Sequence, residues 1–225
     1  MSDLTLQRVG PTFGGSGTAA PLRGTITGAQ VVSDAHGRFQ EAALQGNLYT
    51  FGLSNTALVA ANAIATGLTA TAQPVIGVWN PLTSGKNLVI LQANVIVTTV
   101  ANSAVAPGGF MWVSSVTNGA ITTGSTPINC KTLVASGSVA KSYAVSTALT
   151  GLTVNLAVLR AAAIAPFNAA GAATAVSLLQ GNAVDNVDGS IVVPPGGVVG
   201  IMNQVSTTTC SVSVSLLWEE IPVLV

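Results

Sequence analysis

The clearest pattern of apolar and polar positions lies in residues 209–218. Alternate positions there are apolar or serine: the apolar set is Cys210, Val212, Val214, Leu216 and Trp218, and the serines are Ser211, Ser213 and Ser215. Successive side chains of a β-strand point to opposite faces of the sheet. This segment is therefore predicted to be a strand with one face in a core and one face of small polar side chains.

The chain upstream of this segment is predicted to form further short strands. Val, Ile, Thr and aromatic residues favour strands, and Gly, Pro and Asn mark the turns between them. The predicted strands are residues 48–53, 74–79, 87–100, 109–116, 152–164, 173–179, 189–193, 198–205 and 209–218. Many short strands without a long amphipathic helix favour an all-β sandwich or barrel.

Turns and short helices complete this prediction. Asn118-Gly119 is the strongest hairpin signal, and the Pro194–Gly197 run ends one strand and reverses the chain, because proline cannot donate to a ladder. Two alanine-rich segments, residues 57–72 and 160–170, are compatible with short helices by propensity. Helix is expected only in such short pieces.

The first 47 residues differ from the remainder of the chain. They hold six of its fourteen charged residues, a glycine-rich run at residues 14–17 and little apolar periodicity; the six are Asp3, Arg8, Arg23, Asp34, Arg38 and Glu41. Glycine-rich segments give reach rather than rigidity. We expect an extended N-terminal arm over residues 1–47, with a short strand or turn near 30–45, and a β domain over residues 48–225.

Charge is scarce in the rest of the chain. No carboxylate occurs between Glu41 and Asp185, and charged residues make up 6% of the whole sequence, against about 25% in an average soluble domain. The formal net charge is +0, which gives no electrostatic footprint for nucleic acid. A surface of short uncharged side chains costs little entropy to bury, so we expect the protein to associate with copies of itself.

A membrane location is not expected, although the mean hydropathy is +0.63. The longest apolar stretches, residues 57–68 and 152–165, are interrupted by polar residues and are shorter than the ~20 residues of a spanning helix. The start of the sequence lacks the apolar core of a secretory signal. Cys130 and Cys210 are far apart and are expected to be reduced, as small buried hydrophobic residues.

No group of residues makes a convincing catalytic or metal site. Ser33, Asp34 and His36 could suggest a triad, but they lie in a polar, Gly-flanked loop without a nucleophile elbow. The adjacent Glu219 and Glu220 should point to opposite faces of a strand, and we expect them at a solvated or interface-facing strand end.

The oxygen-rich segment around Asp185 and Asp188, with Asn182 and Asn186, lacks the ligand spacing of a calcium loop. It is expected to turn at Asp188-Gly189 before a strand at 191–193. The glycine runs at 14–17 and 196–197 lack the lysine of a phosphate loop. We therefore expect no catalytic, cofactor-binding or metal-binding residues, no cofactor, and no enzyme activity.

Segments near the two ends of the chain carry a resemblance. Residues 188–197 and the ending Trp-Glu-Glu-Ile-Pro-Val at 218–223 resemble the ends of virion structural proteins of tailed bacteriophages, and residues 31–39 are similar to their N-terminal region. The resemblance implies a jelly-roll-like antiparallel sandwich on the capsid exterior, assembled as a symmetric oligomer. It implies no catalytic residue.

The leading functional hypothesis is therefore a capsid decoration, or cement, protein. Its partners would be the major capsid protein and itself, as a homotrimer or alternatively a dimer, without nucleic acid or membrane. It would be made in the host cytoplasm and located on the capsid exterior. The alternative is a receptor- or glycan-binding tail or tip protein of the virion, although Trp79, Trp112 and Trp218 are expected in the core rather than on a sugar-binding platform.

Overall fold

The protein is described from a computed structural model. The described residues are 38–69, 73–100, 108–117, 124–144, 152, 154–164, 182–208 and 210–223. The chain divides into two units, residues 1–41 and 42–225, and the architecture below is that of the second. Within the described ranges, no helix is long and apolar enough to cross a membrane.

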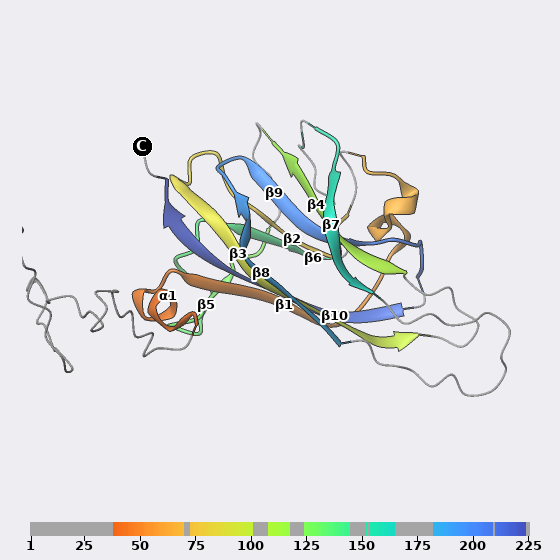
Figure 1. Cartoon of the computed structure of the whole chain (residues 1–225), viewed down its shortest axis with the longest axis horizontal. Helices are drawn as coiled ribbons and strands as arrows, with labels where there is room; N and C mark the ends of the chain where they lie inside the picture. The colour runs from red at the N-terminus through yellow and green to blue at the C-terminus, as the bar shows by residue number, and fades with distance from the viewer. Residues whose placement is uncertain are drawn as a thin grey trace, which may run out of the picture. The chain divides into compact units, whose positions relative to one another are not determined.

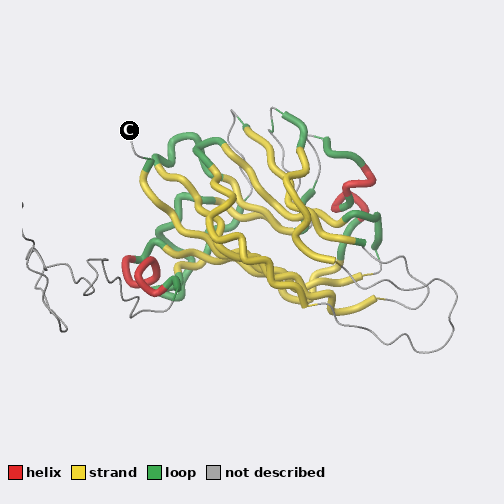
Figure 2. The backbone as a smooth tube through the Cα atoms, in the orientation of Figure 1, coloured by secondary structure: helices red, strands yellow, loops and turns green. Residues whose placement is uncertain are grey.

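The described secondary structure is almost entirely β (Figure 2). The strands are β1 (Leu48–Ala57), β2 (Ile76–Trp79), β3 (Lys86–Val100), β4 (Gly109–Val116), β5 (Ile128–Asn129), β6 (Lys141–Ala144), β7 (Ala157–Ile164), β8 (Asn182–Val193), β9 (Gly197–Asn203) and β10 (Cys210–Pro222). The helical pieces are α1 (Gln40–Gln45) and two 3-10 turns, η1 (Ala60–Asn62) and η2 (Ile64–Thr66).

The strands form two antiparallel sheets of five, in the orders β5-β1-β10-β3-β8 and β6-β2-β9-β4-β7 (Figure 1). Leaving out the short β5 and β6, the pairs β1·β10, β2·β9, β3·β8 and β4·β7 are nested like the two halves of one long hairpin. The further pairs β10·β3 and β9·β4 join the folded hairpin into two sheets. This is the topology of a jelly roll, and it confirms the predicted all-β sandwich.

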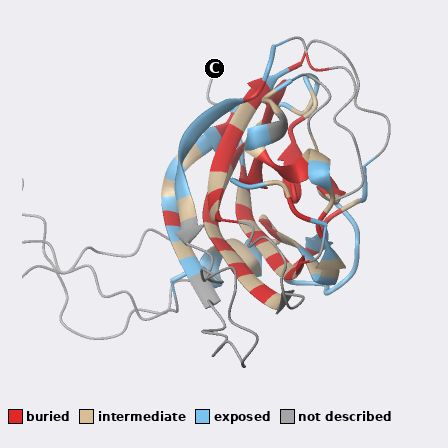
Figure 3. Cartoon of the chain, turned by 90° about the vertical axis from the view of Figure 1, so that its right-hand side faces the viewer, coloured by how far each residue is buried: buried red, intermediate tan, exposed pale blue. Residues whose placement is uncertain are grey.

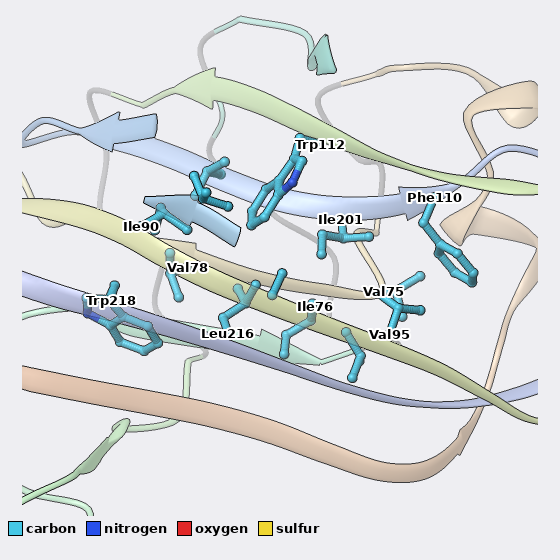
Figure 4. Close-up of a cluster of buried hydrophobic side chains, with 14 of the residues drawn as sticks. Val75, Ile76, Val78, Ile90, Val95, Phe110, Trp112, Ile201, Leu216 and Trp218 are labelled. Atoms are coloured by element: carbon cyan, nitrogen blue, oxygen red, sulfur yellow. The ribbon is translucent and has the colours of Figure 1, made fainter. Parts of the chain in front are cut away.

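The main core lies between the two sheets (Figure 4). The strand β10 supplies the five apolar residues predicted from its alternation, and all five are buried, whereas Ser211, Ser213 and Ser215 face the other way and are only half-buried. Trp112 of β4 enters the same core from the opposite sheet. Because burying one large apolar side chain contributes about 1.5–3 kcal/mol, the regular alternation of β10 is a major source of stability.

The two sheets differ on their outer faces (Figure 3). Every residue of β2 and β9 is buried, because a second apolar cluster covers the outer face of their sheet. That cluster contains Trp79, Val113, Tyr143, Leu152, Leu156, Val198 and Met202, with Ile64 and Leu68 packed against it. We call β6-β2-β9-β4-β7 the covered sheet and β5-β1-β10-β3-β8 the open sheet.

Most predicted strands are confirmed, with changes at their ends. The strand β4 has the predicted bounds, and β1, β2, β3, β7, β9 and β10 overlap their predicted ranges. The strand β8 begins at Asn182, seven residues before the predicted start, and β5 and β6 were not predicted. The predicted strand at 173–179 and the hairpin turn at Asn118-Gly119 lie outside the described residues.

Two predictions of local structure near the alanine-rich segments have different outcomes. The segment 57–72 does contain the short helical turns η1 and η2. The helix considered from Arg160 onward is wrong as far as Ile164, because these residues belong to β7 and pair with β4, with Arg160 opposite Trp112. Pairing with a buried neighbour outweighs the high helix propensity of alanine and arginine, because tertiary context overrides propensity.

The strand or turn expected within residues 30–45 is also corrected over the part that is described. Residues Gln40–Gln45 form α1, whose sequence QEAALQ consists of good helix formers. The helix ends at Gly46, which has a φ of 78°. Gly46 donates to the carbonyl of Ala43 and Asn47 to that of Ala42, the two bonds of a Schellman motif.

Candidate interaction surfaces

Glu220 is the most deeply buried charged group of the β domain. Its side chain has no exposed surface and lies 3.2 Å from the Lys86 ammonium. Its oxygens also accept hydrogen bonds from the Ser138 hydroxyl at 2.6 Å and from the backbone N–H groups of Val139 and Ala140. A buried carboxylate is tolerated when it is paired and fully hydrogen-bonded. Glu220 thereby fixes the end of the β5–β6 connection to the open sheet.

The solvated strand end expected for both glutamates is therefore wrong for Glu220. The two carboxylates do point to opposite faces, as predicted, with Glu219 half-buried and Glu220 fully buried. The alternation of β10 continues past Trp218, so position 220 falls on the core face. The pair cannot act as two cooperating carboxylates.

A second ion pair closes the opposite edge of the sandwich. One guanidinium nitrogen of Arg160 on β7 lies 2.9 Å from both carboxylate oxygens of Asp185 on β8. The Trp112 indole N–H donates to the same carboxylate at 2.6 Å. The ion pair joins the edge strands of the two sheets, and the hydrogen bond from Trp112 satisfies a buried indole. Asp185 therefore has a structural partner on each side.

The oxygen-rich segment around Asp185 and Asp188 does not direct its side chains toward one point. Asp185 faces Arg160, while its neighbour Asn186 accepts a hydrogen bond from Gln92 on the open sheet. Asp188 and Gly189 have φ values of 52° and 78° and form the predicted turn. That turn is a bulge inside β8, opposite the register shift between Ile90 and Gln92 of β3, rather than the start of a separate strand.

The outer face of the open sheet is polar but nearly free of charge. Its side chains bond to one another across the strands: Asn94 donates to Ser215, Thr98 to Asn55, and the Asn55 backbone N–H to Ser213. Gly52 and the short serines leave a shallow hollow of about 290 Å³ there. Because these polar groups already have partners, a second surface can cover them without leaving buried groups unpaired.

A cleft of about 540 Å³ opens between the edge strands β7 and β8. Its walls are mainly apolar, with Arg160 and several serines as polar groups; the lining includes Val116, Leu159, Ile191, Val192, Val193 and Val199. Leu159 and Val192 are each about half exposed. We call this the edge cleft. It joins exposed apolar side chains to a cavity of the size that holds ligands or the side chains of a partner.

A projecting loop lies on the other side of the sandwich. Residues 131–137, between β5 and β6, are all exposed. Leu133 is 78% exposed and has a φ of 60°, a conformation that costs a non-glycine residue energy, and the neighbouring Val134 is 55% exposed. We call this loop the knob. Its sequence contains no alternation or motif that could have identified it beforehand.

The remaining groups that were weighed as sites from the sequence lie only partly within the described residues. Ser33, Asp34, His36 and the glycine run 14–17 lie outside the described residues. No group of three His, Cys, Asp or Glu residues suited to a metal ion occurs within the described ranges. Gly196 and Gly197 form a tight turn after β8, where Gly196 has a φ of 82° and its N–H donates to Asn80.

The two cysteines occupy different environments. Both are free thiols; Cys210 is buried in the main core, as expected, whereas Cys130 is only half-buried. Burial raises the pKa of the Cys130 thiol, which keeps it protonated and lowers its reactivity near neutral pH.

The tryptophans Trp79, Trp112 and Trp218 are all buried, as predicted. Among the described residues, every Phe, Tyr and Trp side chain is buried or half-buried. The described surface therefore offers no aromatic platform for a sugar ring.

Comparison with known proteins assigns no family. No protein-family model and no curated protein sequence matches the chain. Among solved structures, it is similar to a chain of the unassembled KI polyomavirus VP1 pentamer, at 12% sequence identity and a TM-score of 0.11, covering 79% of this chain and 69% of that one. A likeness this slight carries no argument about function.

Proposed function

We propose that the protein is a non-catalytic structural protein of a phage virion, which binds the capsid exterior and stabilises it. The observation that carries the proposal is how the β domain uses its charges. Of eight charged residues in the predicted domain 48–225, four form the pairs Lys86–Glu220 and Arg160–Asp185. The remaining four leave wide uncharged surfaces, which favour association over free solution.

The open sheet is the surface that we propose for the capsid. Its outer face is broad, uncharged over most of its area, and composed of short side chains that are already bonded to one another. Short side chains lose little rotamer freedom on binding. Stable virion contacts require large interfaces with well-satisfied polar groups, and the hydrogen bonds across this face meet the second requirement.

A decoration role also agrees with the use made of titratable groups. General acid–base catalysis needs a group that can exchange a proton with a substrate, and the Glu220 carboxylate is buried and bonded to Lys86, Ser138 and backbone N–H groups. The expectation that the protein is not an enzyme remains part of this proposal. The resemblance of the chain ends to phage virion proteins adds the type of particle.

Removal of the protein from particles tests this function. Virions lacking the chain should lose their DNA at lower temperature or milder osmotic shock than complete virions, and adding the purified protein back should restore resistance. A charged double variant of the open face, Ser211→Glu with Ser213→Glu, should fail to restore it, whereas the control Val205→Glu, at an exposed position after β9 of the other sheet, should restore it. Unchanged stability of the depleted particles would refute the proposal.

The edge cleft favours one alternative, a receptor- or glycan-binding protein of the virion tail. Its volume of about 540 Å³ lies within the range of small-ligand sites, roughly 300–1,000 Å³. The lack of exposed aromatic side chains in the described residues weakens this reading. Gold-labelled antibody on intact virions would separate the two, because label at the tail or baseplate supports the alternative and label over the head supports decoration.

A further inference from the structure

The knob is built to hold its apolar tip away from the domain. At its base, the buried Asn129 side chain accepts hydrogen bonds from the backbone N–H groups of Lys131 and Thr132 and donates to the carbonyl of Gly46. The backbone of Asn129 accepts from the N–H of Leu133 and donates to the carbonyl of Val134. At its other end, Glu220 binds residues 138–140. The loop is thus fixed at both ends.

Leu133 is unfavourable in this position for the isolated domain. Its side chain is 78% exposed and its backbone is in the left-handed region, at a φ of 60°. Strain of this kind persists where the surrounding structure imposes it, and it is concentrated at functional positions. A loop whose backbone is already fixed at both ends loses little further backbone entropy on binding, which makes its apolar tip a good anchor for a partner.

The edge cleft lies on the opposite side of the same sandwich. The strands β5 and β6, which the knob connects, are the first strands of the open and covered sheets, and β8 and β7 are the last. The knob therefore projects from one lateral edge, and the cleft opens at the other. One copy cannot fill its own cleft with its own knob across the width of two five-stranded sheets.

The two edges also differ in charge. The knob edge carries the lysines Lys131 and Lys141, and Lys131 is exposed next to the apolar tip. The cleft edge carries Arg160 with Asp185 and Asp188 and is therefore net negative, since one positive charge stands against two negative charges. Opposite potentials on two surfaces orient their encounter and fix their register.

We propose that copies of this chain associate head to tail, with Leu133 and Val134 of one copy inserted into the edge cleft of the next. The apolar tip would meet Leu159, Ile191 and Val192, and Lys131 would approach Asp188 in the bulge of β8. The inference rests on the self-association included in the proposed function, but it does not require a capsid.

A head-to-tail contact has a consequence for symmetry. It uses two different patches, so it forms a ring if the rotation between copies closes and a filament if it does not. A dimer related by a twofold axis would instead bring identical patches together. The contact proposed here therefore argues against the alternative dimer, and a closed ring of three copies would be the expected trimer.

The first test measures mass by light scattering at micromolar concentration. The wild type should be an oligomer of the 22.3 kDa chain. Leu133→Asp and Val192→Asp should each weaken association by roughly 30-fold or more, as expected for a contact central to an interface. Both positions are exposed, so circular dichroism and Tm should match the wild type. Val205→Asp, at an exposed apolar position away from both edges, is the control and should leave the mass unchanged.

The second test mixes the two defective variants. The Leu133→Asp protein keeps an intact cleft, and the Val192→Asp protein keeps an intact knob. Each alone should be a monomer, and an equimolar mixture should form a 1:1 complex of twice the chain mass. A twofold contact through identical patches predicts no such rescue.

The outcomes separate this proposal from the proposed function. A monomeric wild type, an unaffected Leu133→Asp variant, or no complex in the mixture each overturns the head-to-tail contact. If the contact is supported while depleted virions keep their stability, the capsid role fails and the assembly remains.

Discussion

The open and covered sheets share one core and have the same number of strands, but their central strands differ in the pattern of apolar and polar residues. The strand β10 of the open sheet alternates strictly between core residues and serines, whereas β9 of the covered sheet reads GVVGIMN and is buried throughout. A strand with one free face needs alternation, and a strand buried on both faces does not. The difference shows that the outer face of the covered sheet is buried within the domain, whereas the outer face of the open sheet is not.

The sharpest test of this contrast places the same charge on the two outer faces. Met202→Asp puts a carboxylate into the apolar cluster over the covered sheet, where Met202 is fully buried, and should lower the free energy of unfolding by at least ~4 kcal/mol. Ser211→Asp on the open sheet should change it by less than ~0.5 kcal/mol. Urea denaturation of both variants measures this, and equal losses would mean that the open face is also covered.

The next largest contrast lies within β10 itself. Glu220→Ala removes the buried partner of Lys86 and of the N–H groups at residues 139 and 140, so we expect a loss of about 3–5 kcal/mol. Glu219→Ala, one residue away on the outer face, should cost less than ~0.5 kcal/mol. A comparable cost at both positions, measured by chemical denaturation, would contradict the inward placement of Glu220.

The cluster over the covered sheet contains a polar group whose removal should stabilise the protein. The Tyr143 hydroxyl is buried with no hydrogen-bond partner, so Tyr143→Phe should raise the free energy of unfolding by about 1 kcal/mol. Thermal unfolding at pH 7 measures this. A destabilised Tyr143→Phe protein would indicate that the hydroxyl is bonded.

The same burial raises the pKa of Tyr143, which gives a dependence on pH. The unfolded chain releases this proton near pH 10, before the folded protein does, so the folded state binds more protons above that pH. Ionisation of Tyr143 therefore leaves the free energy of unfolding unchanged below about pH 10 and lowers it as the pH rises further. Tyr143→Phe should reduce that alkaline decline, and urea midpoints between pH 8 and 11 would show whether it does.

The smallest expected effect concerns the edge of the open sheet. Leu133→Gly relieves a left-handed backbone at little steric cost, and we expect the isolated domain to be stabilised by up to about 1 kcal/mol, while self-association is lost. If Leu133 served only the fold, Leu133→Gly would instead destabilise the isolated domain. Denaturation of the variant below its association range distinguishes the two.

The sequence predicts the open sheet better than the covered one because its signal is periodic. The alternation of Ser211, Ser213 and Ser215 with apolar residues located β10 directly. It also placed Glu220 on the core face, a consequence that was available from the pattern and was missed, because paired glutamates are usually solvated. By contrast, β6 is four residues long, KSYA, and is recognised only by its pairing with β2.

The candidate surfaces were largely beyond sequence reasoning. Arg160 and Asp185 lie 25 residues apart, and only the topology brings their strands to the same edge. The knob depends on the buried Asn129, whose role as the base of a turn cannot be distinguished from that of an ordinary loop asparagine. The low charge, however, was visible at once, and it gave the correct expectation that the chain presents uncharged faces.

The position of β10 has a consequence for how the protein is made. It follows every other described strand in the sequence, yet it lies in the middle of the open sheet, where it separates β5-β1 from β3-β8. During synthesis, β10 must therefore emerge from the ribosome before the pair β5-β1 can join the pair β3-β8, since domains generally fold as units. Until then, β1 and β3 expose unpaired backbone and apolar side chains. We expect nascent chains that stop before Cys210 to depend on chaperones and to be sensitive to proteases.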